Sequence, residues 1–552
     1  MHNFNIISRR SFLDRSLKLG LGVALSSLTD IPLVVKRALA EGSIGLQGKK
    51  LLFIFLRGAN DALNSVIPVQ DTAYNSTIRP GILIPKDPSA GFDYSTAPLF
   101  DPTQYLDVGG AGRGANDSTF GYANAINLGN GFAALHPSLK FLVPVYAAGD
   151  LAIIHRVGYP KQSRSHFDSQ DYWESGVPNN KIVKDGIFYR AIVESGLANT
   201  APLTGVSVQS ALPLILRGSK AAMTNLGDPL RYNLLGVPNN TAGNLKADRA
   251  LTAAGDYPFP EKKSRELLQL QYANMLDTLS IFAQIDFTET GNTFKDDVAT
   301  DNDAPYYLFP TDSANTKNGG YALHGNSAAK YVVDSSSSSR RLFQNLKAAA
   351  LVLNNTDAIV AGTEYGGFDT HNSQGGVTGA HANLLRRLGW AIYALRKYFM
   401  VYGKGGSQAK PGAKVSWDDL VIVTLSEFGR TTVQNGSGGT DHAEAGVMLV
   451  AGGAVKGGIF GCHPNDPVPW ITGPADQGGN IDGSMFGVSN RYLKRCYDYR
   501  SVLGKLIRDH LGATPAQLSR IIPGYLDSRE KLEAGGTCQI DNTVIAGEPP
   551  IL

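Results

Sequence analysis

The 552-residue chain has only three cysteines, and no long apolar run follows its first 40 residues. The cysteines, Cys462, Cys496 and Cys538, lack the close spacing of a metal site, and their odd number leaves at least one thiol outside any disulfide. No later stretch reaches the roughly 20 apolar residues that a membrane-spanning helix needs. These absences argue against a fold held together by disulfides, a zinc site with cysteine ligands and an integral membrane span in the mature chain.

An excess of either charge is also missing. The chain has 51 Lys and Arg against 48 Asp and Glu, and the first 40 residues hold six of the basic and two of the acidic residues. The remaining 45 basic and 46 acidic residues nearly cancel, whereas nucleic-acid binding needs a clustered basic face. The composition, 43% hydrophobic and 18% charged, fits a soluble protein, and the length predicts two lobes or one large elaborated domain.

Residues 1–40 have the pattern of a targeting segment. Ser8-Arg9-Arg10-Ser11-Phe12-Leu13 matches a twin-arginine signal, an apolar stretch follows it, and Ala38-Leu39-Ala40 offers a small-x-small cleavage site. A short amphipathic anchor helix is the alternative interpretation. Twin-arginine signals are bacterial export addresses, so we expect the twin-arginine translocase to deliver a folded mature chain, residues 41–552, to the periplasm or cell envelope.

Strand and helix patterns alternate along the mature chain, which predicts an α/β fold with a mostly parallel sheet. We expect strands over residues 50–56, 151–157, 357–363, 421–425 and 447–450, and helices over 135–146, 166–175, 340–353, 381–402 and 499–511. Residues 180–340 carry weaker patterns, and we interpret them as an inserted helical and loop region that covers the sheet or the site.

The stretch from Val421 to Leu425 is apolar and β-branched, as in a strand that is buried on both faces. Glu427 and Arg430 follow it directly, and a glycine-rich loop then presents Asp441 and His442. Ligands bind at the carboxyl ends of strands in open α/β sheets, so the stretch predicts a functional site. A polar loop at a sheet edge is the alternative.

Two other predicted strands, 50–56 and 357–363, also end in acids or imidazoles, and the ends of parallel strands meet at one edge. A single Asp-x-His in a loop is more often a hydrogen-bonded turn, so the hypothesis depends on the strand ends together. The candidate metal ligands are Asp61, Asp369, His371, Glu427 and His442. This mixture of donors suits zinc or another divalent ion such as calcium or magnesium.

A short helix over 166–175 is predicted by a capping box at Ser165 and by Gly176 after its end. Its N-terminus would point toward the carboxyl end of the preceding strand and would attract anions. Ser165 and His166 therefore stand at a helix start that favours an anionic group.

Arginines near the strand ends and the helix start are candidates for binding a phosphate or sulfate group bidentately. They are Arg57, Arg164 and Arg430, and solvation at the surface is the alternative for each of them.

These motifs together resemble an exported bacterial family. They are the twin-arginine start and the stretches 55–61, 165–173, 368–371, 426–431 and 439–442. The family is a domain of unknown function (fifteen-oh-one), which is similar to the alkaline phosphatase and sulfatase superfamily. The resemblance covers nearly all of the mature chain.

The resemblance implies a three-layer α/β/α sandwich with metal ligands at strand ends and a nucleophile at a helix N-terminus. By motif, Asp61 matches the acid after the first strand, and His442 matches the last histidine ligand. The chain departs from the pattern at two positions. Phe428 stands where a histidine is expected after the acid. Ser165 and His166 stand where the resemblance implies the nucleophile, with His166 at the matching position, so both are candidate nucleophiles.

Two functions are compatible with these residues. The first is an exported, metal-dependent hydrolase of small phosphate or sulfate esters. The alternative is a non-catalytic cell-envelope binding protein on the same scaffold, which the missing imidazole and the unusual nucleophile favour. An esterase that uses Ser165 lacks the Gly-x-Ser-x-Gly elbow typical of that class.

Overall fold

The computed structural model describes most of the chain after the predicted signal segment, which itself lies outside the described residues. The described residues are 44–45, 47–100, 124–197, 203–228, 249, 253, 277–287, 294–300, 305–310, 337–463, 465–468 and 492–552. No helix in this part of the chain is long and apolar enough to cross a membrane.

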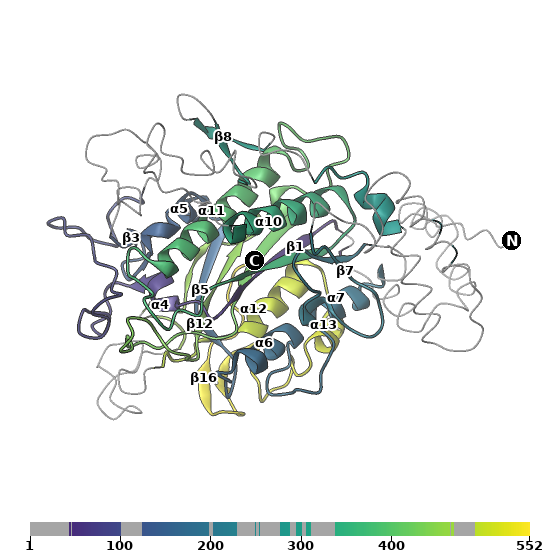
Figure 1. Cartoon of the computed structure of the whole chain (residues 1–552). Helices are drawn as coiled ribbons and strands as arrows, with labels where there is room; N and C mark the ends of the chain where they lie inside the picture. The colour runs from purple at the N-terminus through teal and green to yellow at the C-terminus, as the bar shows by residue number, and fades with distance from the viewer. Residues whose placement is uncertain are drawn as a thin grey trace.

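A nine-stranded mixed sheet forms the centre of the molecule (Figure 1). Its order is β13-β5-β12-β11-β1-β10-β6-β7, and β14 also pairs with β5. The strands are β1 (Lys50–Arg57), β5 (Leu151–Gly158), β6 (Gly205–Ser207), β7 (Thr224–Asn225), β10 (Val360–Gly366), β11 (Leu420–Leu425), β12 (Gly446–Ala451), β13 (Gly458–Phe460) and β14 (Tyr497–Asp498).

Most neighbouring strands of this sheet are parallel, and β12 is the exception. It runs antiparallel to both β11 and β5, so these two strands run in the same direction as each other. Strands β1, β10 and β11 are also parallel. The carboxyl ends of β1, β5, β10 and β11 therefore meet at one edge, and the predicted α/β fold with a mostly parallel sheet is confirmed.

Strand β1 lies in the middle of the sheet, and both of its faces are buried. Because side chains alternate along a strand, Leu52 and Ile54 enter one hydrophobic core and Leu51 and Phe53 enter the other. Phe53 pairs with Gly362 of β10, where an added Cβ would lie 2.4 Å from the Phe53 ring. The aromatic side chain thus occupies the space that the glycine leaves.

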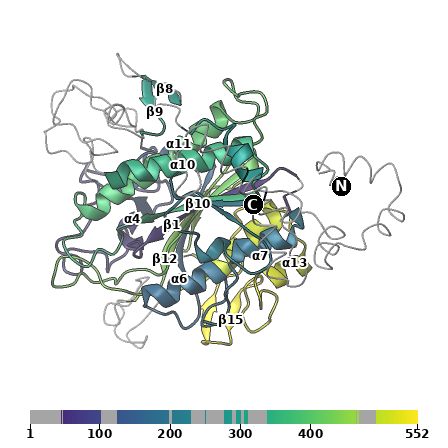
Figure 2. The ribbon, with the colours of Figure 1, turned by 45° about the vertical axis from the view of Figure 1, so that its right-hand side comes forward.

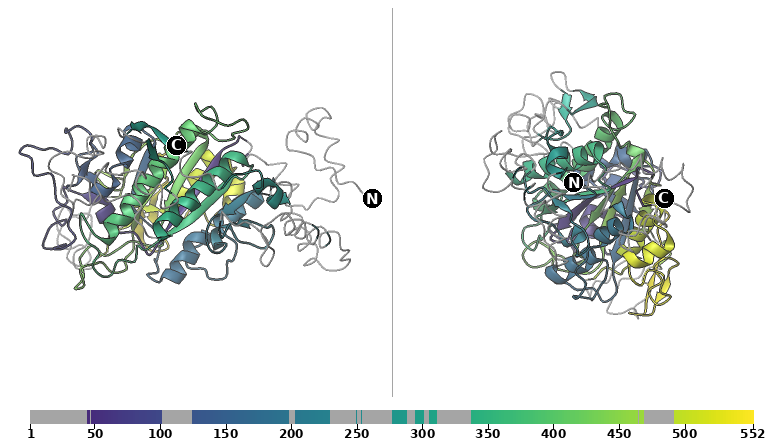
Figure 3. Two further views of the ribbon diagram at one scale, coloured as in Figure 1. Left: turned by 45° about the horizontal axis from the view of Figure 1, so that its top comes forward. Right: turned by 90° about the vertical axis from the view of Figure 1, so that its right-hand side faces the viewer.

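Helices cover both faces of the sheet, on opposite sides of it in Figures 2 and 3. The first core packs against α5 (Leu142–Ala147), α10 (Ser337–Asn355) and α11 (Ala380–Val401). The second packs against α6 (His166–Ser175), α7 (Ile187–Glu194), α12 (Tyr499–Lys505) and α13 (Pro515–Ile521).

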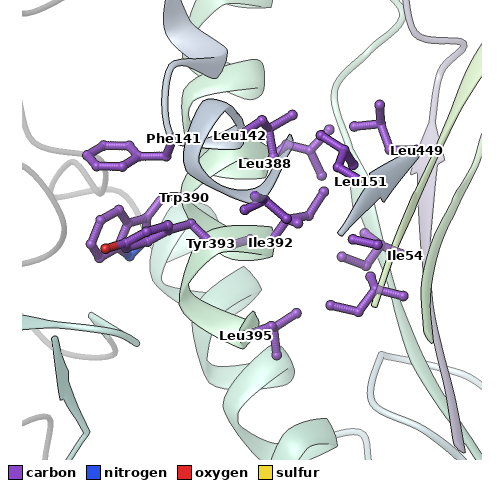
Figure 4. Close-up of a cluster of buried hydrophobic side chains, with 14 of the residues drawn as sticks. Ile54, Phe141, Leu142, Leu151, Leu388, Trp390, Ile392, Tyr393, Leu395 and Leu449 are labelled. Atoms are coloured by element: carbon purple, nitrogen blue, oxygen red, sulfur yellow. The ribbon is translucent and has the colours of Figure 1, made fainter. Parts of the chain in front are cut away.

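Helix α11 shows how this packing follows from helical periodicity. Leu388, Ile392 and Leu395 lie on one side of the helix and point toward the sheet, where Ile54 and Leu449 belong to the same cluster (Figure 4). Full burial of one such side chain stabilises the fold by about 1.5–3 kcal/mol. The sheet edge that carries the strand ends is therefore held by a rigid core.

The predicted helix over 135–146 is wrong in its extent. The segment instead forms β4 (Ala133–Leu135), a 3₁₀ turn at Pro137–Leu139 and then the shorter α5. A continuous helix would place Pro144 in its interior, where proline removes one hydrogen bond and clashes with the carbonyl four residues earlier. The final predicted helix also changes type, since α12 passes into a π-helical turn at Leu506–His510.

The region 180–340 contributes to the main sheet where it is described, because β6 and β7 extend the edge next to β10. It also contains the hairpin of β8 (Lys295–Thr300) and β9 (Pro305–Tyr307). Most of the rest lies outside the described residues. Small elements elsewhere are α4 (Ala62–Ser65), β2 (Val66–Pro68), β3 (Ile126–Asn127), β15 (Gly536–Cys538) and β16 (Thr543–Ile545).

The contact between Phe53 and Gly362 gives a test of this packing. Gly362→Ala should lower the free energy of unfolding by about 1–3 kcal/mol, because the added methyl group overpacks the Phe53 ring. Chemical denaturation monitored by tryptophan fluorescence measures the change. Gly436→Ala is the control, since nothing lies within 4 Å of its added Cβ. Equal destabilisation by the two variants would contradict the assignment.

Candidate metal centre

Helix α6 brings His166 to the sheet edge. Ser165 is its N-cap, with Oγ 3.5 Å from the Asp168 N–H, and Gly176 ends it in the left-handed conformation at φ 68°. The predicted bounds of the helix are confirmed. At the first helical position, the Nδ1 atom of His166 lies 2.8 Å from Oε1 of Glu427, the acid that follows β11.

Glu427 is fully buried and acts as a hydrogen-bond acceptor. Its Oε1 also accepts from the Gly58 N–H at 2.8 Å and from Gln170 at 3.1 Å. Burial alone would raise the pKa of Glu427, but these hydrogen bonds, led by the one from His166, hold it below its usual range. The same hydrogen bond raises the pKa of His166. Glu427 is therefore an anion whose Oε1 is committed to three N–H donors.

Asp369 lies between three imidazoles. Its Oδ1 is 3.1 Å from Nε2 of His371 and 3.3 Å from Nε2 of His442, and its Oδ2 is 3.5 Å from Nε2 of His166. The two Nε2 atoms of His371 and His442 are 2.9 Å apart. All four side chains are 24–46% exposed, so the cluster is open to solvent.

The second nitrogen of each imidazole faces an oxygen acceptor. Nδ1 of His371 lies 3.1 Å from Oδ1 of Asp441, and Nδ1 of His442 lies 2.8 Å from the Arg164 carbonyl oxygen. A carbonyl or carboxylate oxygen can only accept, so each Nδ1 can donate a proton to its acceptor, and in the neutral ring Nε2 then keeps a lone pair. Two lone pairs facing each other at 2.9 Å repel unless a proton or a metal ion lies between them.

This arrangement matches the donor set of a metal centre. His166, Asp369 and His442 each offer one ligand atom, and these three atoms lie within 4.8 Å of one another. His371 contacts two of the three residues. Imidazole nitrogen with one carboxylate suits zinc, whereas calcium and magnesium prefer oxygen donors. Metal-binding histidines generally donate their other ring N–H to a carboxylate or carbonyl, as all three do here.

Phe428 stands where the resemblance implied another histidine. Its ring centroid lies 4.8 Å from that of His166 and 4.7 Å from that of His442. The side chain is fully buried and forms an apolar wall behind the two imidazoles. Phe428 has no atom that could bind a metal ion, whereas the two imidazole rings that it contacts carry candidate ligand nitrogens.

A close approach of the loop after β1 to the loop after β10 positions Asp369. Gly58 has φ 107°, and an added Cβ would lie 2.3 Å from the backbone nitrogen of Asp369. Only glycine fits this combination of positive φ and contact. The N–H of the same residue donates to Glu427, so Gly58 connects the loops of three strands.

Arg430, a candidate for anion binding, is fully buried and holds these loops together. Its guanidinium donates to Oδ1 of Asp369, the proposed ligand, through Nη2. It also donates to four backbone carbonyls at 3.0 Å, those of Gly58, Ala59, Phe368 and Thr440. Its Nε, Nη1 and Nη2 atoms are thus all engaged by the protein.

Arg57 is held by the protein through Nε and Nη2, and its Nη1 is buried without a hydrogen-bond partner among the described residues. It pairs with Glu174 at 2.7 Å and with Glu364 at 3.2 Å, and its guanidinium carbon lies 3.9 Å from the Phe55 ring centroid. The two carboxylates compensate its charge. Neither of these two predicted anion-binding arginines presents a free guanidinium toward the cluster.

Asp61, a candidate ligand, makes its contacts away from the cluster. It caps helix α4 and pairs with Arg79 at 2.8 Å, and Gln374 donates to its Oδ2 at 2.7 Å. Burial would raise the pKa of Asp61, but Arg79 holds it below its usual range. Arg79 also donates to the carbonyl of Thr431, which ties Asp61 to the loop that carries Arg430.

Some of the predicted site residues therefore have roles that differ from the predicted ones. Asp369, His371 and His442 meet as expected, whereas His166 joins them through a ring nitrogen and Glu427 lies behind it. Asp441, which precedes His442 in the glycine-rich loop, orients His371. Arg79 was missing from the candidates, because it lies in a stretch without strand or helix periodicity.

Fold and cluster together define an α/β protein with a histidine- and aspartate-rich site at the carboxyl edge of its sheet. Residues 322–466 match the model of a family described as "Protein of unknown function (DUF1501)". This segment contains Asp369, His371, Glu427 and His442 and supports the resemblance to that family. No curated protein and no solved structure matches the chain, and no comparison supports the similarity to alkaline phosphatases or sulfatases.

The contacts of Asp61 distinguish a structural acid from a metal ligand. Asp61→Asn should lower the free energy of unfolding by about 3–5 kcal/mol, because it leaves the Arg79 charge buried without its partner. Since its folded pKa is depressed, this contribution is fully present above about pH 4 and is lost as pH falls through the folded pKa. Denaturation curves between pH 3 and pH 7 should show the wild-type advantage shrinking at the acid end. An advantage that grows toward low pH would contradict this assignment.

Proposed function

We propose that the chain is an exported, metal-dependent hydrolase of small phosphate or sulfate esters. The observation that carries this proposal is the convergence of three imidazole Nε2 atoms on Asp369, with each Nδ1 bound to an oxygen acceptor. Such convergence at a solvent-open sheet edge suits catalysis better than a structural ion, which is usually enclosed. The export signal and an alkaline-phosphatase-like α/β/α layering belong to the proposal.

His166, Asp369, His371 and His442 would hold the ion, and zinc fits their nitrogen-rich donor set. A bound divalent ion would polarise an ester oxygen and lower the pKa of a coordinated water. Asp441 and Glu427 orient two of the imidazoles, and Arg430 keeps Asp369 in place. These residues prepare the site before substrate arrives.

His166 suits the role of a ligand better than that of a nucleophile. Its Nδ1 proton is committed to Glu427, and its Nε2 atom faces Asp369. Ser165 is exposed, and its hydroxyl lies at the start of the same helix. We therefore assign the candidate nucleophile to Ser165, with a coordinated water as the alternative attacking group.

The non-catalytic envelope binding protein is the second candidate, and one observation favours it. Arg57 and Arg430, which would have held a substrate anion, are bound to protein carboxylates and carbonyls. A binding protein would retain the ion and lack turnover. Hydrolysis of a panel of phosphate and sulfate esters by the metal-loaded protein separates the two functions.

Metal content tests the centre directly. Purified mature protein should contain about one equivalent of zinc, and His166→Ala or His442→Ala should lose most of it, because each removes one converging nitrogen. Elemental analysis after dialysis gives the stoichiometry. His463→Ala, a histidine outside the cluster, is the control and should retain the metal. Absence of metal and of turnover with zinc, calcium and magnesium would refute the proposal.

The role of Glu427 behind His166 gives a second test. Glu427→Gln removes the charge but keeps the shape, and it should weaken metal affinity by about 10- to 100-fold because His166 loses its orienting anion. Competition with a chelator of known affinity measures the change. Glu364→Gln, which alters an acid paired with Arg57, should leave affinity unchanged. Equal affinities of Glu427→Gln and wild type would remove Glu427 from the centre.

A further inference from the structure

A cavity of about 130 Å³ lies far from the metal centre, beside the last turns of helices α10 and α11. The two helices lie side by side on one face of the sheet (Figure 2). Because α10 ends just before β10 begins, the cavity is at the amino edge of the sheet. Helix α11 has 22 residues, so roughly 30 Å of helix separates the cavity from the loop that carries Asp369 and His371.

One part of the cavity lining is aromatic. Phe294, Tyr398 and Tyr402 line it, and all three are buried. The Phe294 ring centroid lies 4.9 Å from that of each tyrosine in an edge-to-face arrangement. The centroids of the two tyrosine rings lie 5.8 Å apart, with an angle of 23° between the ring planes. Each ring thus contacts the other two, so this wall has a fixed shape.

Much of the remaining lining is polar. Gln284, Asn355 and Gln408 contribute side-chain amides, and all three residues are exposed. The Asn355 amide nitrogen donates to the Leu351 carbonyl oxygen at 2.8 Å. The side chains of Gln284 and Gln408 form no hydrogen bond within the described part of the chain. An amide both donates and accepts, so these groups match the hydrogen bonding of hydroxyl groups.

Charge and size limit the ligand further. Asp286 and Lys410 also line the cavity, and their opposite charges leave the lining without a net charge. It therefore favours neither an anion nor a cation. A cavity of about 150 Å³ holds one benzene molecule. A volume of about 130 Å³ thus suits a single six-membered ring whose substituents extend toward the exposed amides.

We propose that this cavity binds one neutral pyranose unit, either a free monosaccharide or the end of a glycan. A pyranose has a face of C–H groups, which packs on aromatic rings, and an edge of hydroxyl groups, which bond to amides. A purely apolar ring would leave the amides without partners, and a charged ligand would lack a compensating charge. The inference is independent of the proposed hydrolase, since no residue of the cavity belongs to the metal centre.

Saturation-transfer NMR and calorimetry on the mature protein test this binding. The probes are D-glucose, D-galactose, D-mannose and N-acetyl-D-glucosamine. At least one should bind with a Kd on the order of 1 mM or tighter, as expected for a ligand of about 12 to 15 non-hydrogen atoms. If its methyl glycoside binds as well, the cavity accepts the end of a glycan, and binding of the free sugar alone assigns it to monosaccharides. Phenol is the comparison, because its ring has a similar size and a single hydroxyl.

Ala413 lines the cavity and gives the sharpest variant. Ala413→Leu should weaken sugar binding by about tenfold or more, because the larger side chain occupies the space of the ring. Ala409→Leu is the matched control, since Ala409 lies in the same loop with similar exposure but does not line the cavity. Gln408→Ala, at an exposed position, should weaken binding by roughly 2- to 10-fold, the net contribution of one hydrogen bond.

Several outcomes would overturn the inference. They are no binding by any of the four sugars, binding of phenol alone, and wild-type affinity in both Ala413→Leu and Gln408→Ala. A loss in Ala409→Leu as large as that in Ala413→Leu would show a disturbed loop and would also overturn it.

Zinc content and ester hydrolysis report separately on the metal centre. Protein that binds a sugar but no zinc would refute the metal-dependent hydrolase and leave the sugar site standing. Zinc-loaded, active protein that binds no sugar would do the reverse.

Discussion

The site depends on the hydrogen bonds that the buried guanidinium of Arg430 donates to the surrounding loops. It donates to the carbonyls of Gly58 and Phe368, which follow β1 and β10, and to Asp369 itself. A charge without access to water must be compensated within the protein, and here backbone carbonyls supply most of that compensation. Three loops that would otherwise vary independently are thereby fixed relative to one another.

The oxygen acceptors behind the histidines determine which ring nitrogen carries the proton. Glu427 is buried, whereas Asp441 is 43% exposed. Glu427, Asp441 and the Arg164 carbonyl each take the Nδ1 proton of one histidine, so the Nε2 lone pairs face the same volume. When both rings are neutral with the proton on Nδ1, the Nε2 lone pairs of His371 and His442 face each other at 2.9 Å and repel. A proton or a bound cation between them would relieve that repulsion.

Much of the fold was predictable because its signals are local. Gly176 and the cap at Ser165 mark the ends of α6, and the apolar runs mark the central strands. The predicted helix over 135–146, before β5, is too long, because Pro144 does not fit inside a continuous helix. The role of Asp61 as the buried partner of Arg79 could not be predicted from the sequence, because Arg79 lies 18 residues away in a stretch without periodicity. The proposed roles of His166 as a ligand and of Glu427 as the acid that orients it depend on a contact between the two residues, which lie 261 positions apart in the sequence.

The proposed centre combines buried supporting residues with exposed candidate ligand atoms, which would affect how the protein acquires an ion. Glu427 and Arg430 are inaccessible to solvent, while Asp369 remains 46% exposed. The loops are thus ordered by contacts that need no metal, and the ligand atoms can be reached from outside. Loading of the proposed ion would therefore follow folding, and the ion bound at equilibrium would reflect the metals available in the compartment where the folded protein resides.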